Sequence, residues 1–238
     1  MPGSCATVDL SAALNAWSAA FAAHGFDGAT LARVARDAGV AVDRLATALA
    51  GRWEALDQLN LAIDRAALAR ATPDPSASMR DRLFDLAMAR FDAMRAHRPA
   101  LRRLLADARR RPGLALCLAL QLGRSASTLL GAADAPTTGL AGIARIKALA
   151  AILADVGHVW ETDEDPDLGA TMAALDRRLG QAERCALRLC GRATAPEPGP
   201  GPQAADVPDL PDIPEPAPDA APDGLPDAGG DTPAPKPA

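Results

Sequence analysis

The stretch GATLARVARDAGVAVDRLATALAGRW, residues 28–53, decides the fold of the N-terminal part of this chain. Its apolar residues recur every three or four positions, which is the spacing of one face of an α-helix. Thr30 is a natural N-cap for a helix over 30–37, and Gly39 interrupts the pattern before a second helix over 42–49. The stretch therefore predicts two short helices joined by a tight turn.

Helical patterns continue on both sides of this stretch. A helix over 10–23 is expected to end at Gly25, and a longer helix over 53–71 is followed by the loop TPDPSAS, residues 72–78. Further helical spacing runs over 79–97, 138–162 and 167–190. The buried face of the 42–49 helix is expected to consist of Val42, Leu45 and Leu49.

Composition supports an all-α fold. Hydrophobic residues make up 49% of the chain, but most are Ala and Leu, with four Phe, three Trp and no Tyr. Ala and Leu favour helices, whereas strand-forming residues are sparse. We expect a helix-turn-helix domain over 8–52 and a larger helical domain over 53–192. The first helix of the second domain links the two.

The last segment differs in composition from the rest. Residues 194–238 hold 14 of the 21 prolines, and nine acidic residues against one lysine give this segment a net charge of −8. The whole chain carries −5, so residues 1–193 carry +3. Such a segment buries too little apolar surface to offset the entropy of ordering. The sequence therefore predicts a disordered, acidic, proline-rich tail over 193–238.

The sequence favours a cytoplasmic protein without catalytic chemistry. No signal peptide is evident, and the longest apolar run, residues 114–122, is too short to span a bilayer. The four cysteines have no spacing that suggests a disulfide framework or a zinc site. Phosphate-binding loops and metalloprotease motifs are missing, and the three histidines are scattered. We expect no enzyme activity, no metal and no cofactor.

Residues 21–40, FAAHGFDGATLARVARDAGV, resemble the start of a TetR-type helix-turn-helix domain. Phe21, the Gly25–Phe26 pair, Thr30 and the Ala38–Gly39–Val40 turn fall on the positions of that pattern without a gap. The resemblance implies a TetR-like fold: three short helices, a linking helix and a larger helical domain. It also implies that residues 53–192 form a ligand-binding and dimerisation domain. The implied homodimer is built on the last two helices, binds operator DNA and responds to a small apolar ligand.

The second short helix departs from the family pattern. Ala46 and Ala48 stand where the family has a Tyr and a His that touch phosphates. The resemblance and the remaining polar side chains give Thr30 and Arg52 as phosphate contacts, Arg44 as a contact to a guanine edge, and Thr47 beside it. The alternative is an inherited scaffold, in which these arginines are ordinary solvated helix residues.

A second resemblance covers the larger domain. Residues 79–104 and 141–179 are similar to TetR-related proteins that shade into the accessory family of ubiquinone biosynthesis, whose members bind lipids and have a TetR-like fold. This family implies an isoprenoid lipid as ligand and a helix-turn-helix that no longer reads DNA. Together the two resemblances cover about residues 10–190. The expected ligand pocket comprises Phe91, Met94, His158 and Trp160.

Two features leave alternatives open. The alanines of the 138–162 helix suit either an apolar cavity or close helix packing without one. From Arg80 to Arg111 there are ten Arg and four Asp, a net charge of +6. These arginines are either exposed solvated residues or a binding surface. Such a surface suits an anionic membrane, a phosphorylated partner or the acidic tail of the chain itself.

The sequence thus supports three hypotheses about function. The first is a ligand-responsive TetR-family transcriptional regulator. The second is a lipid- or quinone-binding accessory protein of ubiquinone biosynthesis with a vestigial helix-turn-helix. The third is an interaction module that uses the proline-rich tail.

Overall fold

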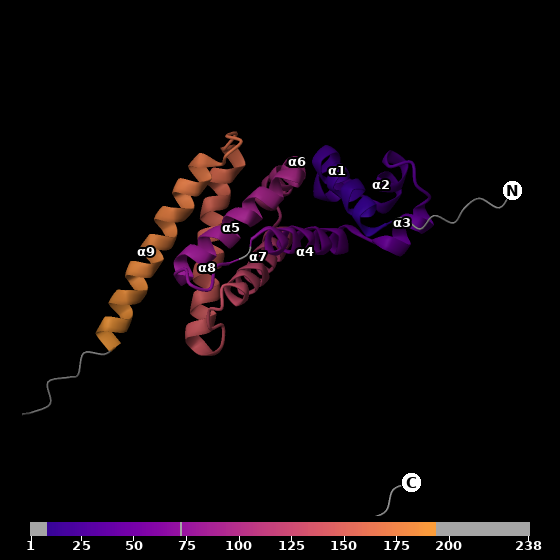
Figure 1. Ribbon diagram of the computed structural model, residues 1–238. Coiled ribbons are helices and arrows are strands. Elements are labelled where there is room, and N and C mark those ends of the chain that lie inside the picture. Colours follow the sequence, from indigo (N-terminus) through magenta and orange to yellow (C-terminus); the bar gives the residue numbers. More distant parts are fainter. Residues whose placement is uncertain (1–8, 72, 194–238) are drawn as a thin grey trace, which may run out of the picture. The chain divides into compact units, whose positions relative to one another are not determined.

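A computed structural model describes residues 9–71 and 73–193, and within these ranges every regular element is a helix (Figure 1). This confirms the expected all-α fold. Apart from Ala193, the tail expected over 193–238 lies outside the described residues. The elements are α1 (Leu10–Gly28), α2 (Leu31–Asp37), α3 (Val42–Ala48), α4 (Arg52–Arg70), α5 (Met79–Met94), the 3₁₀ turn η1 (Arg95–His97), α6 (Arg98–Ala108), α7 (Pro112–Ala132), α8 (Gly139–Thr162) and α9 (Gly169–Ala193).

Local signals account for several helix boundaries. Thr30 caps α2, because its Oγ1 accepts a hydrogen bond of 3.4 Å from the backbone N–H of Arg33. Pro99 and Pro112 lie in the first turns of α6 and α7, where a missing N–H costs nothing. Helix α9 begins two residues later than expected, since Leu168 has a left-handed φ of 51° and cannot continue a helix.

The break in α1 at Gly25 positions the first helix of the motif. Gly25 has φ 71° and ψ −178°, so one turn of helix follows it in a new direction up to Gly28. The break frees the backbone N–H of Phe26, which donates a hydrogen bond of 2.8 Å to Oδ2 of Asp107 on α6. A Cβ atom at Gly25 would lie 2.5 Å from this oxygen. Glycine is therefore required there by both the backbone angle and the contact.

Helices α1 to α3 and the start of α4 form an N-terminal head around an apolar core. Three aromatic rings pack in a row in this core. The ring centroid of Phe21 lies 5.8 Å from that of Trp17 and 6.1 Å from that of Phe26. The expected packing residues Leu45 and Leu49 are fully buried, whereas Val42, also expected to be buried, is 46% exposed. The core also includes Ala100 and Leu104 of α6 and Leu114 of α7. The head therefore shares its core with the larger helical part, and the domain boundary at 52/53 stays a prediction.

The larger helical part, which we call the body, has a second apolar core. Buried residues of α5, α7, α8 and α9 contribute to it, among them Phe91, Leu129 and Trp160. Helix α9 lies beside α8 and also packs on α5 (Figure 1). Leu175 and Leu179 of α9 are buried in this packing, whereas Met172 is 42% exposed.

Helix α7 is the element that comes closest to a membrane span. It is the single helix in the described residues that is long and apolar enough to cross a membrane, by length and composition only. This length includes polar residues beyond the uninterrupted apolar run at 114–122. Gln121 and Ser125 of α7 are nevertheless buried against polar groups of α4, with hydrogen bonds to Asp57 and Asp64. These contacts are those of a helix that packs inside a protein.

Candidate DNA-reading head and ligand cavity

Three of the four residues expected to contact DNA lie on the exposed surface of the α2–turn–α3 motif. Thr30 is at the N-terminus of α2, and Arg44 and Thr47 are on α3. The Thr47 hydroxyl donates a hydrogen bond of 2.9 Å to the carbonyl oxygen of Asp43 in its own helix. Helix α3 has no side-chain cap, because Ala41 occupies its N-cap position. The exposed end of α3 thus carries one long cationic side chain, that of Arg44.

The fourth residue, Arg52, is held by the end of α1. Its Nη1 lies 3.3 Å from the carbonyl oxygens of Phe26 and Asp27 and from the Asp27 carboxylate. The guanidinium also lies 5.5 Å from the centre of the Phe26 ring. In this position Arg52 fixes the direction of α4 relative to α1. To contact a phosphate, it would have to exchange these partners.

The charge around the motif is balanced rather than basic. Residues 25–60 carry four Arg and five acidic residues. Asp27 pairs with Arg52 and also with Arg111 at the start of α7, and Asp37 is 2.8 Å from His24. These pairs stabilise the head internally. They leave little positive charge for a phosphate backbone, whose neutralisation supplies most of the affinity for DNA.

A cavity of about 400 Å³ lies between α5, α6, α7 and α8, and Asn60 of α4 also lines it. The four residues expected to form a ligand pocket, Phe91, Met94, His158 and Trp160, all line this cavity. Phe91 and Trp160 are buried, whereas the His158 side chain is 68% exposed and lies at the rim. The structure therefore brings these four residues together around one space. Their role in binding stays a prediction.

The cavity has a polar inner wall that the sequence analysis missed. Arg90 is buried, and its Nε donates a hydrogen bond of 2.8 Å to Oδ1 of Asp64 on α4. Its Nη2 lies 2.8 Å from Oδ1 of Asn60 and 3.3 Å from Oγ of Ser125. Ser125 in turn donates a hydrogen bond of 2.6 Å to Oδ2 of Asp64. The signal for this network was present, since Arg90 and Asp64 both fall within apolar helical faces.

The cavity has a charged rim. Glu161 lies 3.3 Å from Nη2 of Arg109 and 3.5 Å from Nδ1 of His158. Arg109 and His158 both line the cavity and are largely exposed, so they mark where the cavity meets solvent. A ligand entering here would pass charged groups before reaching apolar walls.

Most arginines of the 80–111 segment are engaged within the protein. Several bind carboxylates, as Arg80 does with Asp176 and Arg103 with Asp107. Others bind backbone carbonyl oxygens, as Arg82 does with that of Ala133. Carboxylates also bind Arg90, Arg109 and Arg111, and backbone carbonyl oxygens also bind Arg95 and Arg98. A binding surface for anionic membranes thus stays a prediction, and the acidic tail lies outside the described residues.

The described residues include no group of three or more His, Cys, Asp or Glu that is placed to hold a metal ion. Cys117 and Cys185 are free thiols, while Cys5 and the Cys190 side chain lie outside the described residues. Burial raises the pKa of Cys117, which keeps it protonated and poorly nucleophilic.

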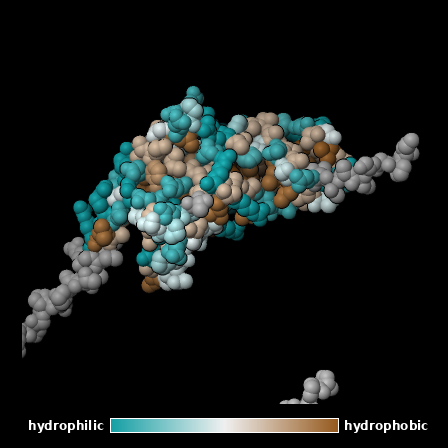
Figure 2. Space-filling view, in the orientation of Figure 1, coloured by the Kyte–Doolittle hydropathy of each residue, from teal (hydrophilic) through white to brown (hydrophobic). Residues whose placement is uncertain are grey.

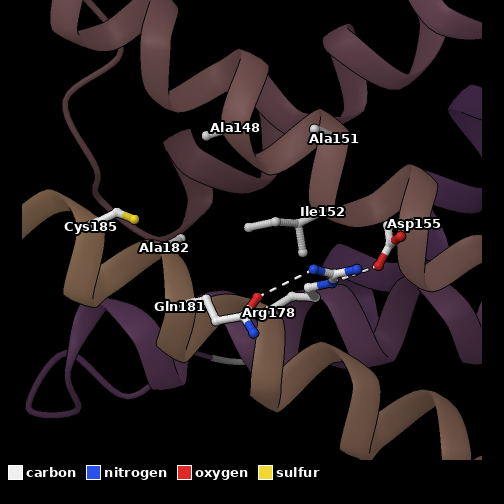
Figure 3. A pocket seen from close by; sticks show the side chains of 8 residues that line it. All are labelled: Ala148, Ala151, Ile152, Asp155, Arg178, Gln181, Ala182 and Cys185. Atoms are coloured by element: carbon white, nitrogen blue, oxygen red, sulfur yellow. Dashed lines mark hydrogen bonds and ion pairs between the residues drawn. The ribbon is translucent and has the colours of Figure 1, made fainter.

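A shallow groove of about 330 Å³ runs between α8 and α9 (Figure 3). Ala148, Ala151 and Ile152 line it from α8, and the small side chain of Ala182 faces them from α9. At one end Arg178 of α9 forms an ion pair of 2.6 Å with Asp155 of α8. Apart from this groove, exposed hydrophobic residues form separate small patches between hydrophilic residues on the molecular surface (Figure 2).

Comparison with known proteins identifies the fold. No protein-family profile matches the sequence, and no curated protein matches it either. The structure is similar to that of a TetR transcriptional regulator from Nitrosomonas europaea, with a TM-score of 0.60 and 17% identity over 74% of this chain and 98% of that chain. It is also similar to a TetR-family regulator from Rhodococcus sp., with a TM-score of 0.51 and 23% identity over 74% and 96% of the two chains. The described part of the chain therefore has the TetR-like fold that residues 21–40 predicted.

Proposed function

We propose that this protein is a DNA-binding transcriptional regulator of the TetR type, whose affinity for its operator responds to a small apolar ligand. The observation that carries the proposal is the position of α4. At its N-terminus, Arg52 binds the end of α1, next to the helix-turn-helix. Two to three turns further on, Asn60 and Asp64 bind Arg90 on the wall of the cavity. One helix thus contacts both the reading head and the ligand site.

Regulation follows from this arrangement in a homodimer. Two heads must fit successive major grooves, about 34–36 Å apart, for both to bind at once. A ligand that alters the contacts of Arg90 with Asn60 and Asp64 moves α4, and with it the spacing of the heads. The proposed dimer forms on the outer face of α8 and α9, where Ala148 and Ala151 are exposed. Such a regulator acts in the cytoplasm.

DNA contact in this proposal rests on few side chains. Arg44 reaches a guanine edge from α3, Thr47 lies beside it, and Thr30 approaches a phosphate from the N-terminus of α2. Arg52 joins them only if it exchanges its partners on α1. We therefore expect modest affinity with a shallow dependence on salt.

The test is an electrophoretic mobility shift with DNA from upstream of the protein's own coding sequence, across a series of salt concentrations. We expect a preference for this DNA over a scrambled sequence. Arg44→Ala should reduce the specific binding by about one to two orders of magnitude, equivalent to roughly 1–3 kcal/mol. Arg65→Ala, on an exposed face of α4 away from the motif, is the matched control and should bind normally. No sequence preference even at low salt would overturn the proposal.

A second candidate is a lipid- or quinone-binding accessory protein whose helix-turn-helix is vestigial. The observation in its favour is the lack of available positive charge on the head, where Arg52 is engaged and acids outnumber arginines. Contact of the 80–111 segment with an anionic membrane belongs to this candidate. Native mass spectrometry of the gently purified protein tests it. A bound isoprenoid-sized mass together with no DNA preference supports this candidate, and an empty cavity counts against it.

A further inference from the structure

The cavity wall carries hydrogen-bond donors that have no oxygen acceptor among the described residues. The Arg90 guanidinium has five N–H groups. Three of them donate to oxygen atoms. The Nε–H donates to Asp64, and the two N–H groups of Nη2 donate to Asn60 and Ser125. The acceptor found for Nη1 among the described residues is the thioether sulfur of Met94, at 3.1 Å. A thioether is a weak acceptor, so a buried cationic edge of Arg90 is poorly satisfied.

A second donor on the same wall lacks a partner. Trp160 is fully buried and lines the cavity, and its Nε1–H has no hydrogen-bond partner among the described residues. Buried donors of this kind cost free energy unless something accepts from them. Because Arg90 and Met94 also line the cavity, both unsatisfied donors belong to groups at its surface.

The charge of this wall is already neutralised. The Arg90 and Asp64 side chains form a buried ion pair at 2.8 Å, with side-chain exposures of 6% and 7%. A carboxylate or phosphate brought to Arg90 would leave one negative charge uncompensated in a buried site, which is costly. An uncharged oxygen has no such cost and still gains a hydrogen bond from a cation.

From these three observations we infer that the cavity binds an uncharged molecule with an apolar body and a carbonyl-type oxygen, a ketone or ester, which accepts from Nη1 of Arg90 in place of Met94. The inference rests on the proposed function, because it names the chemical class of the small apolar ligand that the proposed regulator binds. The other walls of the cavity, including Phe91, Leu104 and Leu153, enclose the apolar body. The volume of about 400 Å³ falls within the range of small-molecule sites.

The decisive experiment compares three probes of matched size on the full-length protein without DNA. Butyrophenone carries an uncharged carbonyl, butylbenzene carries no acceptor, and phenylbutyrate carries an anion. Isothermal titration calorimetry measures their dissociation constants. We expect butyrophenone to bind about tenfold or more tighter than either of the others, since a hydrogen bond to a charged group contributes about that factor.

Met94→Leu makes the test specific to Arg90. Leucine keeps the volume but removes the sulfur, so Nη1 loses the acceptor that a ligand must displace. The preference for butyrophenone over butylbenzene should therefore rise several-fold. Met88→Leu, also on α5 but outside the cavity lining, is the matched control and should leave the preference unchanged.

Removing the donor should have the opposite effect. The double variant Arg90→Met with Asp64→Leu replaces the ion pair by apolar side chains, which buried sites commonly tolerate. We expect its preference for butyrophenone to fall several-fold. If this variant does not fold, the comparison of Met94→Leu with Met88→Leu still decides the matter.

Several results would overturn the inference. They are equal binding of butylbenzene and butyrophenone, tighter binding of phenylbutyrate, no binding of any probe, or an unchanged preference in Met94→Leu. Because the titrations contain no DNA, each of these results leaves the mobility-shift test of the proposed regulator untouched. Conversely, a failure to bind DNA does not alter the order of the three probes.

Discussion

The carboxylate of Asp107 on α6 accepts a hydrogen bond of 2.8 Å from the backbone N–H of Phe26, at the break in α1. This contact joins the N-terminal head to a helix of the cavity. Leu101, Leu104 and Leu105 of α6 line the cavity, while Asp107 binds the head. Helix α6 therefore connects the cavity to the head independently of α4.

Removing the Asp107 carboxylate should weaken the attachment of the head. Asp107→Ala leaves a half-buried N–H without an acceptor, so we expect the free energy of unfolding to fall by roughly 1–3 kcal/mol. Asp107→Asn retains an acceptor oxygen and should cost less. Urea unfolding followed by circular dichroism measures both, with Asp85→Ala on the exposed side of α5 as control. Equal stability of Asp107→Ala and the wild type would contradict the role of this bond.

Two glycines with a similar positive φ should respond differently to alanine. Gly25 has φ 71° with ψ −178°, a region of backbone angles almost restricted to glycine, and Gly39 has φ 66°, so alanine at either position incurs backbone strain of about 1–3 kcal/mol. A Cβ at Gly39 meets no atom within 4 Å, whereas one at Gly25 meets Asp107 Oδ2 at 2.5 Å. We expect Gly25→Ala to lower the melting temperature clearly more than Gly39→Ala. Equal shifts for the two variants would mean that the Asp107 contact contributes nothing.

Stability should depend on pH through His97. Burial lowers the pKa of this imidazole, whose Nδ1 lies 3.0 Å from Oγ of Ser18 on α1. With the folded pKa below the unfolded value of about 6.5, the unfolded chain takes up the proton first as the pH falls. This contribution to stability is thus complete above pH ~6.5 and declines below it until the folded pKa is passed.

The measurement is urea unfolding of the wild type and of His97→Gln across this pH range. We expect the wild type to lose stability on acidification more steeply than the variant, which lacks the titrating group. An identical pH dependence in the two proteins would exclude His97 as the cause.

A bulky charged side chain in the groove between α8 and α9 should prevent formation of the proposed dimer. Ala151 is exposed on α8 and lines the groove, so Ala151→Arg places a long cation on the proposed interface. We expect size-exclusion chromatography with light scattering to show a dimer for the wild type and a monomer for this variant. Ala106→Arg, at an exposed alanine of α6, is the control and should remain dimeric. A monomeric wild type would remove the dimer from the proposal.

The helices α1 to α5, α8 and α9, the cap at Thr30, the break at Gly25 and the helix-turn-helix were predictable from the sequence, whereas α6 and α7 had no predicted bounds. Each depends on residues within a turn or two of one another, where apolar spacing, capping and glycine angles act directly. Even Phe91, Met94, His158 and Trp160, named from the sequence, line one cavity. The sequence alone therefore determined most of the helices and the fold class.

Only the tertiary structure decided which charged side chains are engaged. Arg90 looked like one member of a basic segment until α4 placed Asp64, 26 residues away in the chain, 2.8 Å from it. The turn after Gly25 brings the Phe26 carbonyl oxygen to Arg52, whose contact with a phosphate stays a prediction. Val42 remained exposed because the packing of α3 directs only Leu45 and Leu49 inward. These outcomes depend on how distant helices meet, which a local pattern does not specify.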